Sequence, residues 1–78
     1  MKQFSIAIHS LEEVQAFVSL ATVQPFPVLV GNERQRTNGK SFMGMISLDY
    51  SEPVTVQVEC DEAAFCRFCR EAERFLVH

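Results

Sequence analysis

Apolar residues recur at two different spacings along this sequence, and the change from one spacing to the other limits the fold more than any other feature. Residues 2–8 alternate, with Phe4, Ile6 and Ile8 on one face, and residues 54–58 alternate in the same way around valines. Alternation with a period of two predicts half-buried strands. Each of these segments is followed directly by apolar residues at helical spacing. The sequence therefore predicts short strands and amphipathic helices that share one core.

Two helices are predicted from their start signals and their apolar stripes. Ser10 and Glu13 have the spacing of a capping box, in which each side chain accepts a hydrogen bond from the backbone N–H of the other. This helix is expected to end near Thr22, ahead of two prolines. The last helix is expected to begin at Cys60 or Asp61. The apolar stripes are Val14, Phe17, Val18 and Ala21 in the first helix, and Phe65, Phe68, Cys69, Ala72, Phe75 and Leu76 in the last.

The middle of the chain predicts two more strands and a short helix. Residues 28–30 are expected to form a buried strand, and residues 33–37 a polar edge strand guarded by Arg34 and Arg36. A short helix and the valine-rich strand follow. The expected order is β-α-β-β-α-β-α, which favours an α+β open-faced sandwich with a four-stranded antiparallel sheet and helices on one face.

Composition and charge argue against several classes of function. The chain has 78 residues, which predicts a single domain over residues 1–78, and its net charge of −3 leaves no broad basic surface for nucleic acid. No apolar run approaches the ~20 residues of a membrane span, and the first residues alternate too regularly for a signal peptide. Three cysteines, an odd number, are typical of free thiols in a reducing compartment. We therefore expect a cytoplasmic protein that binds neither nucleic acid nor membrane.

The segment from Asn38 to Leu48 contains the strongest candidate for a binding surface. Asn38 and Gly39 predict a turn, and Ser41 then stands where a helix N-cap is expected. The helix offers more large apolar side chains than one face can bury, so some of them are expected near solvent. The residues expected to bind a partner are Lys40, Phe42, Met43 and Ile46. The alternative is a short core helix in which the serine is only a cap.

The order of the elements and the segment 38–48, Asn-Gly-Lys-Ser-Phe-Met-Gly-Met-Ile-Ser-Leu, resemble the histidine-containing phosphocarrier protein (HPr) family of the bacterial sugar phosphotransferase system. The resemblance extends from about Lys2 to Leu76. Its most specific part is this segment, which is similar to the family's stretch around a regulatory serine. The final valine-rich strand, the acidic turn and the amphipathic helix also match in kind.

The same resemblance implies that the phosphoryl-carrying motif is missing. In the family, a histidine that opens the first helix accepts a phosphoryl group, and an arginine follows two residues later, with a proline next. Counted back from residues 16–18, these positions fall on Ser10, Glu12 and Glu13. His9 lies one place early, beside a capping hydroxyl and two carboxylates that disfavour a phosphoryl group. The alternative is an active phosphocarrier that uses His9 as the phosphoryl acceptor.

Ser41 keeps the family pattern, and the resemblance implies that a kinase phosphorylates it. A phosphate there is expected to lie at a helix N-terminus beside Lys40. The resulting interpretation is a regulatory protein-interaction module without phosphohistidine carrier activity, similar to the catabolite-repression HPr-like proteins. The candidate partners are an HPr-type kinase, a phosphotransferase enzyme or a transcriptional regulator.

The cysteines are the last candidates for chemistry. Cys66 and Cys69 have C-x-x-C spacing and Cys60 lies nearby, but the pair falls inside a predicted helix rather than at its start, where a thiolate is stabilised. A zinc site needs four ligands, and only His78 could supplement the three thiols. The sequence favours small buried apolar residues over a metal or thiol module. We expect no cofactor and no enzyme activity.

Overall fold

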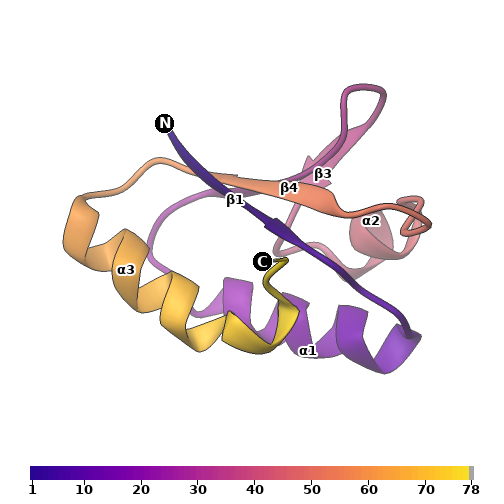
Figure 1. Cartoon of the computed structure of the whole chain (residues 1–78), viewed down its shortest axis with the longest axis horizontal. Helices are drawn as coiled ribbons and strands as arrows, with labels where there is room; N and C mark the ends of the chain where they lie inside the picture. The colour runs from indigo at the N-terminus through magenta and orange to yellow at the C-terminus, as the bar shows by residue number, and fades with distance from the viewer. Residues whose placement is uncertain (78) are drawn as a thin grey trace.

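The computed structural model describes residues 1–77 of the chain. The order of elements is the one that the sequence predicts, with a 3₁₀ turn added at the end (Figure 1). The elements are β1 (Lys2–Ile6), α1 (Leu11–Thr22), β2 (Val28–Gly31), β3 (Arg36–Asn38), α2 (Phe42–Ile46), β4 (Val54–Val58), α3 (Glu62–Glu71) and η1 (Glu73–Phe75). None of the helices in this range combines the length and the hydropathy of a membrane span.

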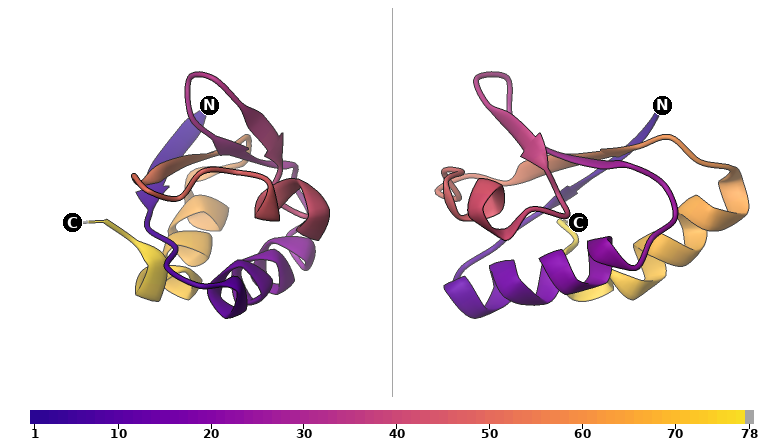
Figure 2. Two further views of the ribbon diagram at one scale, coloured as in Figure 1. Left: turned by 90° about the vertical axis from the view of Figure 1, so that its right-hand side faces the viewer. Right: turned by 180° about the vertical axis from the view of Figure 1, so that it is seen from behind.

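The four strands form one antiparallel sheet in the order β1-β4-β2-β3, which confirms the predicted architecture. β4 lies inside the sheet and pairs with β1 from Lys2↔Val58 to Ile6↔Val54, and with β2 along its other side. β1 and β3 are therefore the edge strands. α1 and α3 run beneath one face of the sheet, and α2 packs beside α1 at one end (Figures 1 and 2).

The core lies between the sheet and the helices. Phe68 on α3 is the centre of an aromatic cluster, because its ring centroid lies 5.5 Å from that of Phe4, 6.2 Å from Phe17 and 5.7 Å from Phe26. Truncation of a buried phenylalanine typically costs about 3–5 kcal/mol. The cluster thus holds α1 and α3 to the sheet. The fully buried side chains that the sheet contributes are Ile6, Val28, Val30, Val54, Val56 and Val58.

β1 is two residues shorter than the sequence predicts, because the residues after it pair with the C-terminal segment. The Ala7 N–H donates to the Phe75 carbonyl at 2.8 Å, and the Val77 N–H donates to the Ser5 carbonyl at 3.0 Å. This segment covers part of the outer edge of β1, which would otherwise be open to pairing with another chain. α3 likewise ends earlier than its apolar stripe suggests, and η1 brings Phe75 into the core.

β3 begins later than predicted because a turn takes up the preceding residues. The Asn32 side-chain oxygen accepts hydrogen bonds from the backbone N–H groups of Arg34 and Gln35, both at 2.9 Å. Arg34 therefore lies in the turn, and Arg36 is the arginine that guards the edge strand.

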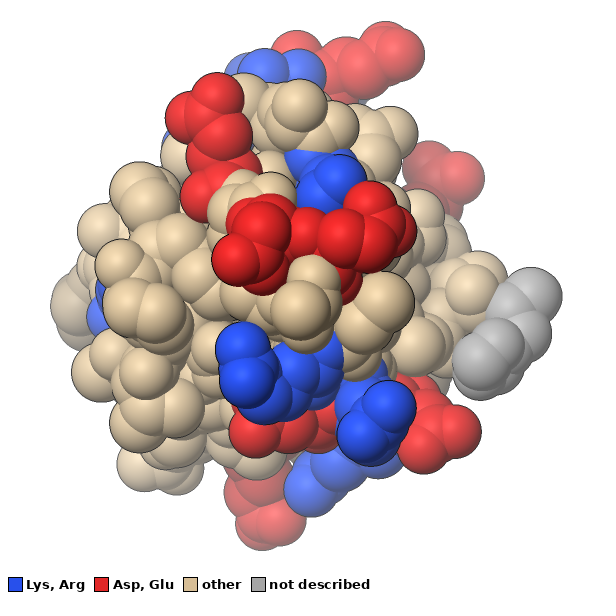
Figure 3. Space-filling view, turned by 90° about the vertical axis from the view of Figure 1, so that its left-hand side faces the viewer, with Lys and Arg blue, Asp and Glu red and all other residues tan. Residues whose placement is uncertain are grey.

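Charged side chains of both signs are interspersed at the end of the molecule where α3 begins (Figure 3). Lys2 Nζ lies 3.1 Å from Glu62 Oε2, and exposed pairs of this kind contribute about 0–1 kcal/mol. Within residues 1–77, the charged residues along the outer side of α3 form no ion pair with one another, although their spacing permits it.

Gly44 allows α2 to approach the edge strand. A Cβ atom at this position would overlap Oγ1 of Thr37 on β3 and would lie 3.2 Å from the Thr37 Cβ. Glycine inside a helix costs roughly 1 kcal/mol relative to alanine. The close approach of α2 to β3 explains why a glycine stands here, although it lowers helix stability.

We expect Gly44→Ala to lower the free energy of unfolding by about 1–3 kcal/mol, because overpacking outweighs the better helix propensity of alanine. Urea unfolding measures the change, and Gly44→Ala combined with Thr37→Ala should recover part of it. Met43→Ala is the matched control in the same helix, with a side chain that is exposed. A Gly44→Ala protein as stable as the wild type would contradict the contact.

Candidate functional site

The start of α1 and the helix α2 lie at the same end of the molecule, which is the right-hand end in Figure 1 and faces the viewer in the left panel of Figure 2. A hollow of about 520 Å³ lies there. We call it the α1–α2 hollow. It is lined by Ile8, His9, Ser10, Leu11, Val14, Ile46, Tyr50 and Ser51.

The start of α1 is fixed by two side chains, only one of which acts as the capping box predicts. Ser10 is the N-cap, with extended backbone angles, and its Oγ accepts a hydrogen bond from the Glu13 N–H at 3.2 Å. The Glu13 carboxylate accepts from the N–H of His9, at 2.8 Å, and not from that of Ser10. Successive N–H groups of an extended chain point to opposite sides, so the N–H one residue before the cap is the one that faces the first turn.

His9 lies at the rim of the hollow beside a carboxylate. Its side chain is 78% exposed, and its Nδ1 lies 3.4 Å from Oε1 of Glu13. The same oxygen atom therefore faces both the backbone N–H and the ring of His9. Within the described part of the chain, neither lysine nor arginine is among the residues that line the hollow. An anion on the His9 ring would meet a negative neighbour and no cation from the lining.

The short helix α2 divides its apolar residues between the core and the surface. Met45 and Leu48 are buried in the core, and Phe42 is half-buried against it. Met43 is 72% exposed and Ile46 is 39% exposed, as expected for a run too apolar for one face. Of the residues predicted to bind a partner, Met43 and Ile46 are thus presented to solvent.

Ser41 is the N-cap of α2, as the sequence predicts. Its Oγ accepts a hydrogen bond from the Gly44 N–H at 3.2 Å, and the residue is half-buried. α2 has only five residues, so its dipole and free N–H groups are weaker than those of a long helix. Modification of Ser41 stays a prediction.

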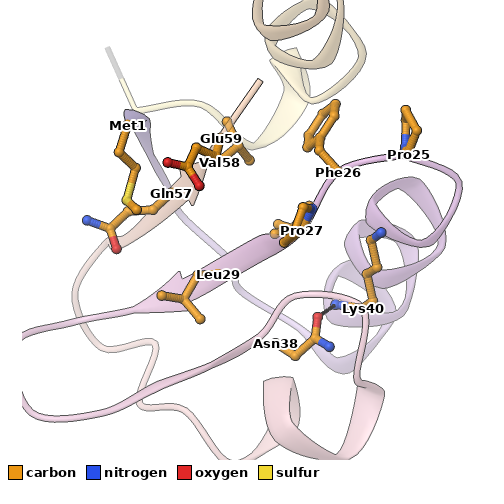
Figure 4. Close-up of a pocket in the computed structure, with 11 residues that line it drawn as sticks. Met1, Pro25, Phe26, Pro27, Leu29, Asn38, Lys40, Gln57, Val58 and Glu59 are labelled. Atoms are coloured by element: carbon orange, nitrogen blue, oxygen red, sulfur yellow. Dashed lines mark hydrogen bonds between the residues drawn. The ribbon is translucent and has the colours of Figure 1, made fainter. Parts of the chain in front are cut away.

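Lys40 does not extend the surface around Ile46. Its ammonium group donates to the carbonyl oxygen of Gln24, just beyond the end of α1, at 2.8 Å. The lysine lines a different hollow of about 560 Å³, together with Pro25 and Leu29 (Figure 4). Lys40 is expected to stabilise a phosphate on the next residue, but its ammonium group already makes this hydrogen bond. The two interactions therefore compete.

Tyr50 holds the end of α2 and forms one wall of the α1–α2 hollow. Its hydroxyl donates to the Met45 carbonyl at 2.6 Å and lies 3.8 Å from the Met45 sulfur. Burial raises the pKa of Tyr50 to about 12. No sequence pattern points to this residue, since a single tyrosine in a polar loop carries no periodic signal.

The fold of this chain is similar to that of solved structures of known proteins. No protein-family model and no curated protein matches the chain. The structure of HPr-C-His from Thermoanaerobacter tengcongensis superposes with a TM-score of 0.72 and 28% sequence identity, covering 94% of this chain and 92% of that one. Over nearly its full length the chain is similar to the HPr-like family. This confirms the resemblance and the fold expected from the sequence.

A second structure shows the fold of this HPr-like chain at lower identity. The histidine-containing phosphocarrier protein of Mycoplasma superposes with a TM-score of 0.66 and 13% identity, covering 95% of this chain and 98% of that one. The shared architecture thus extends over nearly the full length of both proteins, whereas most side chains differ.

Cys66 and Cys69 of this HPr-like chain lie on α3 and Cys60 lies just before it, and none of them lines the hollow. All three are free thiols, with Cys60 and Cys69 half-buried and Cys66 exposed, so the expectation of buried cysteines is wrong for Cys66. Burial raises the pKa of the Cys69 thiol, and the neighbouring Cys66 and Cys60 raise it further. Within residues 1–77, no group of histidine, cysteine and carboxylate side chains is arranged to hold a metal. His78 lies outside the described residues.

We expect Tyr50→Phe to lower the free energy of unfolding by about 0.5–1.5 kcal/mol near neutral pH, through loss of the bond to Met45. The folded pKa of Tyr50 lies above the ordinary value of 10.0. Its proton therefore contributes stability that is complete below about pH 10 and is lost as the pH rises toward about 12.

Urea unfolding near neutral pH and at about pH 11 tests both effects. Tyr50 is the only tyrosine and the chain has no tryptophan, so the near-ultraviolet absorbance of tyrosinate reports its ionisation directly. An ionisation midpoint of Tyr50 near the ordinary pKa of a tyrosine would contradict the buried hydrogen bond to Met45. So would a Tyr50→Phe protein that loses as much stability at alkaline pH as the wild type does.

Proposed function

We propose that this HPr-like chain is a regulatory protein that docks a protein partner at the α1–α2 hollow and α2, and that it carries no phosphoryl group on a histidine. It acts as a binding protein and not as an enzyme. The partner classes that fit are an HPr-type kinase, a phosphotransferase enzyme and a transcriptional regulator.

The observation that carries the proposal is the contact between Glu13 and His9. The carboxylate lies 3.4 Å from the ring nitrogen and also accepts the backbone N–H of His9 at 2.8 Å. Like charges at about 4 Å repel by roughly 1–4 kcal/mol between bulk water and a protein surface. A phosphoryl group on the ring would therefore be destabilised by the side chain that fixes the start of α1.

The residue that opens α1 also supports a protein without carrier activity. The structural N-cap is Ser10, the position at which the family resemblance expects a phosphoryl-accepting histidine. Its hydroxyl already accepts a hydrogen bond from the first turn. Glu12 stands where the resemblance expects an arginine, so the cation that would stabilise a transferred phosphoryl group is replaced by an anion.

The exposed apolar side chains around the hollow support a docking role. Leu11 is 62% exposed and Ile46 is 39% exposed, and both line the hollow. Met43 on α2, two residues after Ser41, has most of its surface open. Apolar side chains gathered on one patch of a small domain mark an interaction surface. A phosphate on Ser41 would add up to two negative charges next to this patch and would change which partners dock.

The alternative is an active phosphocarrier that uses His9. One observation favours it: the imidazole is exposed at the rim of a hollow at the start of α1, where an incoming partner reaches it. The absence of a lysine or arginine from the lining and the carboxylate contact weigh against it.

With phosphoenolpyruvate and the first enzyme of the phosphotransferase system, we expect the wild-type chain to gain no acid-labile phosphate. Loss of a stabilising group at a reacting centre lowers rates on the order of 10²-fold or more. A variant that combines Ser10→His, Glu12→Arg and Glu13→Pro restores the motif and should gain phosphate detectable by intact mass. Acid-labile phosphate on the wild type that is lost in His9→Ala would establish the alternative.

With an HPr kinase and ATP, we expect acid-stable phosphate on the wild type and none on Ser41→Ala. Loss of this cap costs about 1 kcal/mol, so circular dichroism must show that the variant is folded. Ser47→Ala, at the other end of α2, is the matched control and should remain a substrate. No added phosphate on the wild type, or phosphate retained by Ser41→Ala, would remove Ser41 from the proposal.

A further inference from the structure

The charges around the α1–α2 hollow are distributed unevenly. Residues 3–33 and 41–66 contain no lysine or arginine, and all the residues that line the hollow belong to these two stretches. Glu12 and Glu13 follow Leu11 in the first turn of α1, and Asp49 and Glu52 flank the other wall. Apart from Glu13, these carboxylates are exposed to solvent.

The neighbouring polar hollow continues this acidic rim. It shares Ser51 with the α1–α2 hollow and is lined by the carboxylates of Glu33, Asp49 and Glu52 and by one cation, Arg34. The end of the molecule at which α3 begins differs, because basic and acidic side chains are interspersed there (Figure 3). The apolar patch is thus bordered by negative charge in excess.

We propose that the α1–α2 hollow takes a protein segment that presents an apolar side chain flanked by arginine or lysine residues. This inference rests on the docking role proposed above and names the chemistry of the partner. A hollow of about 520 Å³ with Leu11 and Ile46 exposed beside it accommodates an aliphatic or aromatic side chain. The carboxylates at its rim then attract flanking cations and repel an acidic partner.

Two short peptides test this preference. Both have a central Leu-Phe pair, which is flanked by arginines in one and by glutamates in the other. We expect the arginine peptide to bind at least about fivefold more tightly at low salt, and the preference to shrink as salt screens the rim. Amide chemical shifts of the ¹⁵N-labelled protein should change around His9, Leu11 and Ile46.

Charge-reversed variants separate the rim from the overall negative charge of the protein. Glu12→Lys combined with Glu52→Lys should weaken the arginine peptide by roughly tenfold, because two attractive contacts become repulsive. Glu59→Lys combined with Glu73→Lys changes the net charge equally at exposed carboxylates that lie outside the hollow, and it should have little effect.

The outcomes distinguish a failure of the basic partner from a failure of the docking role. Equal binding of both peptides at the hollow overturns the basic partner while the docking role stands. Shifts confined to another surface, or no binding of either peptide, overturn both. A dimer in sedimentation that Leu11→Glu dissociates would make a second copy of the chain the occupant, which also overturns the basic partner.

Discussion

The ring of Phe68 joins the two layers of this molecule, and the other elements take their places around it. It contacts Phe4 from the sheet, Phe17 from α1 and Phe26 ahead of β2, and its own side chain is fully buried. A single-core domain of this size has only about 3–5 kcal/mol of net stability, so the loss of this contact is comparable with the whole. The position of α1, and with it the start of that helix, depends on this packing.

The groups at the start of α1 determine which chemistry this end of the molecule favours. In an HPr-like fold the first turn of this helix lies beside α2, so whatever groups it presents share a surface with the apolar residues of α2. Here the first turn presents Ser10 and Glu13, whose polar atoms cap the helix and bind His9. Carboxylates beside the His9 ring disfavour a phosphoryl group there, whereas the apolar side chains of Leu11 and Ile46 stay exposed.

Sequence patterns predict the parts of this fold that depend on local periodicity. The alternation around Val56 and the stripe around Phe68 fix which faces are buried, and the caps at Ser10 and Ser41 are both formed. The short β1 could not be predicted, because its end depends on hydrogen bonds with a segment about seventy residues later. The late start of β3 depends on an asparagine side chain that closes a turn, which competes with the strand over the same residues.

The candidate site was predicted less completely, for the same reason. The exposure of Met43 and Ile46 could be predicted, because the short helix has more large apolar residues than one face can bury. The bond of Lys40 to Gln24, the hydroxyl of Tyr50 on Met45 and the exposed Leu11 depend on which elements meet in space, and no local pattern encodes them. Glu13 was expected to cap its own helix, and its contact with His9 emerged only from the geometry of the chain before the cap.

The claim that this chain works through its exposed apolar surface, and not through a phosphoryl group on His9, is tested most directly in the organism that carries the gene. Transcript profiles would be compared between a deletion strain and strains in which the gene is replaced by Leu11→Glu with Ile46→Glu, or by His9→Ala. We expect the surface variant to reproduce the deletion profile at normal protein levels and the histidine variant to match the wild type. A His9→Ala strain that behaves like the deletion, beside a surface variant that behaves like the wild type, would contradict the claim.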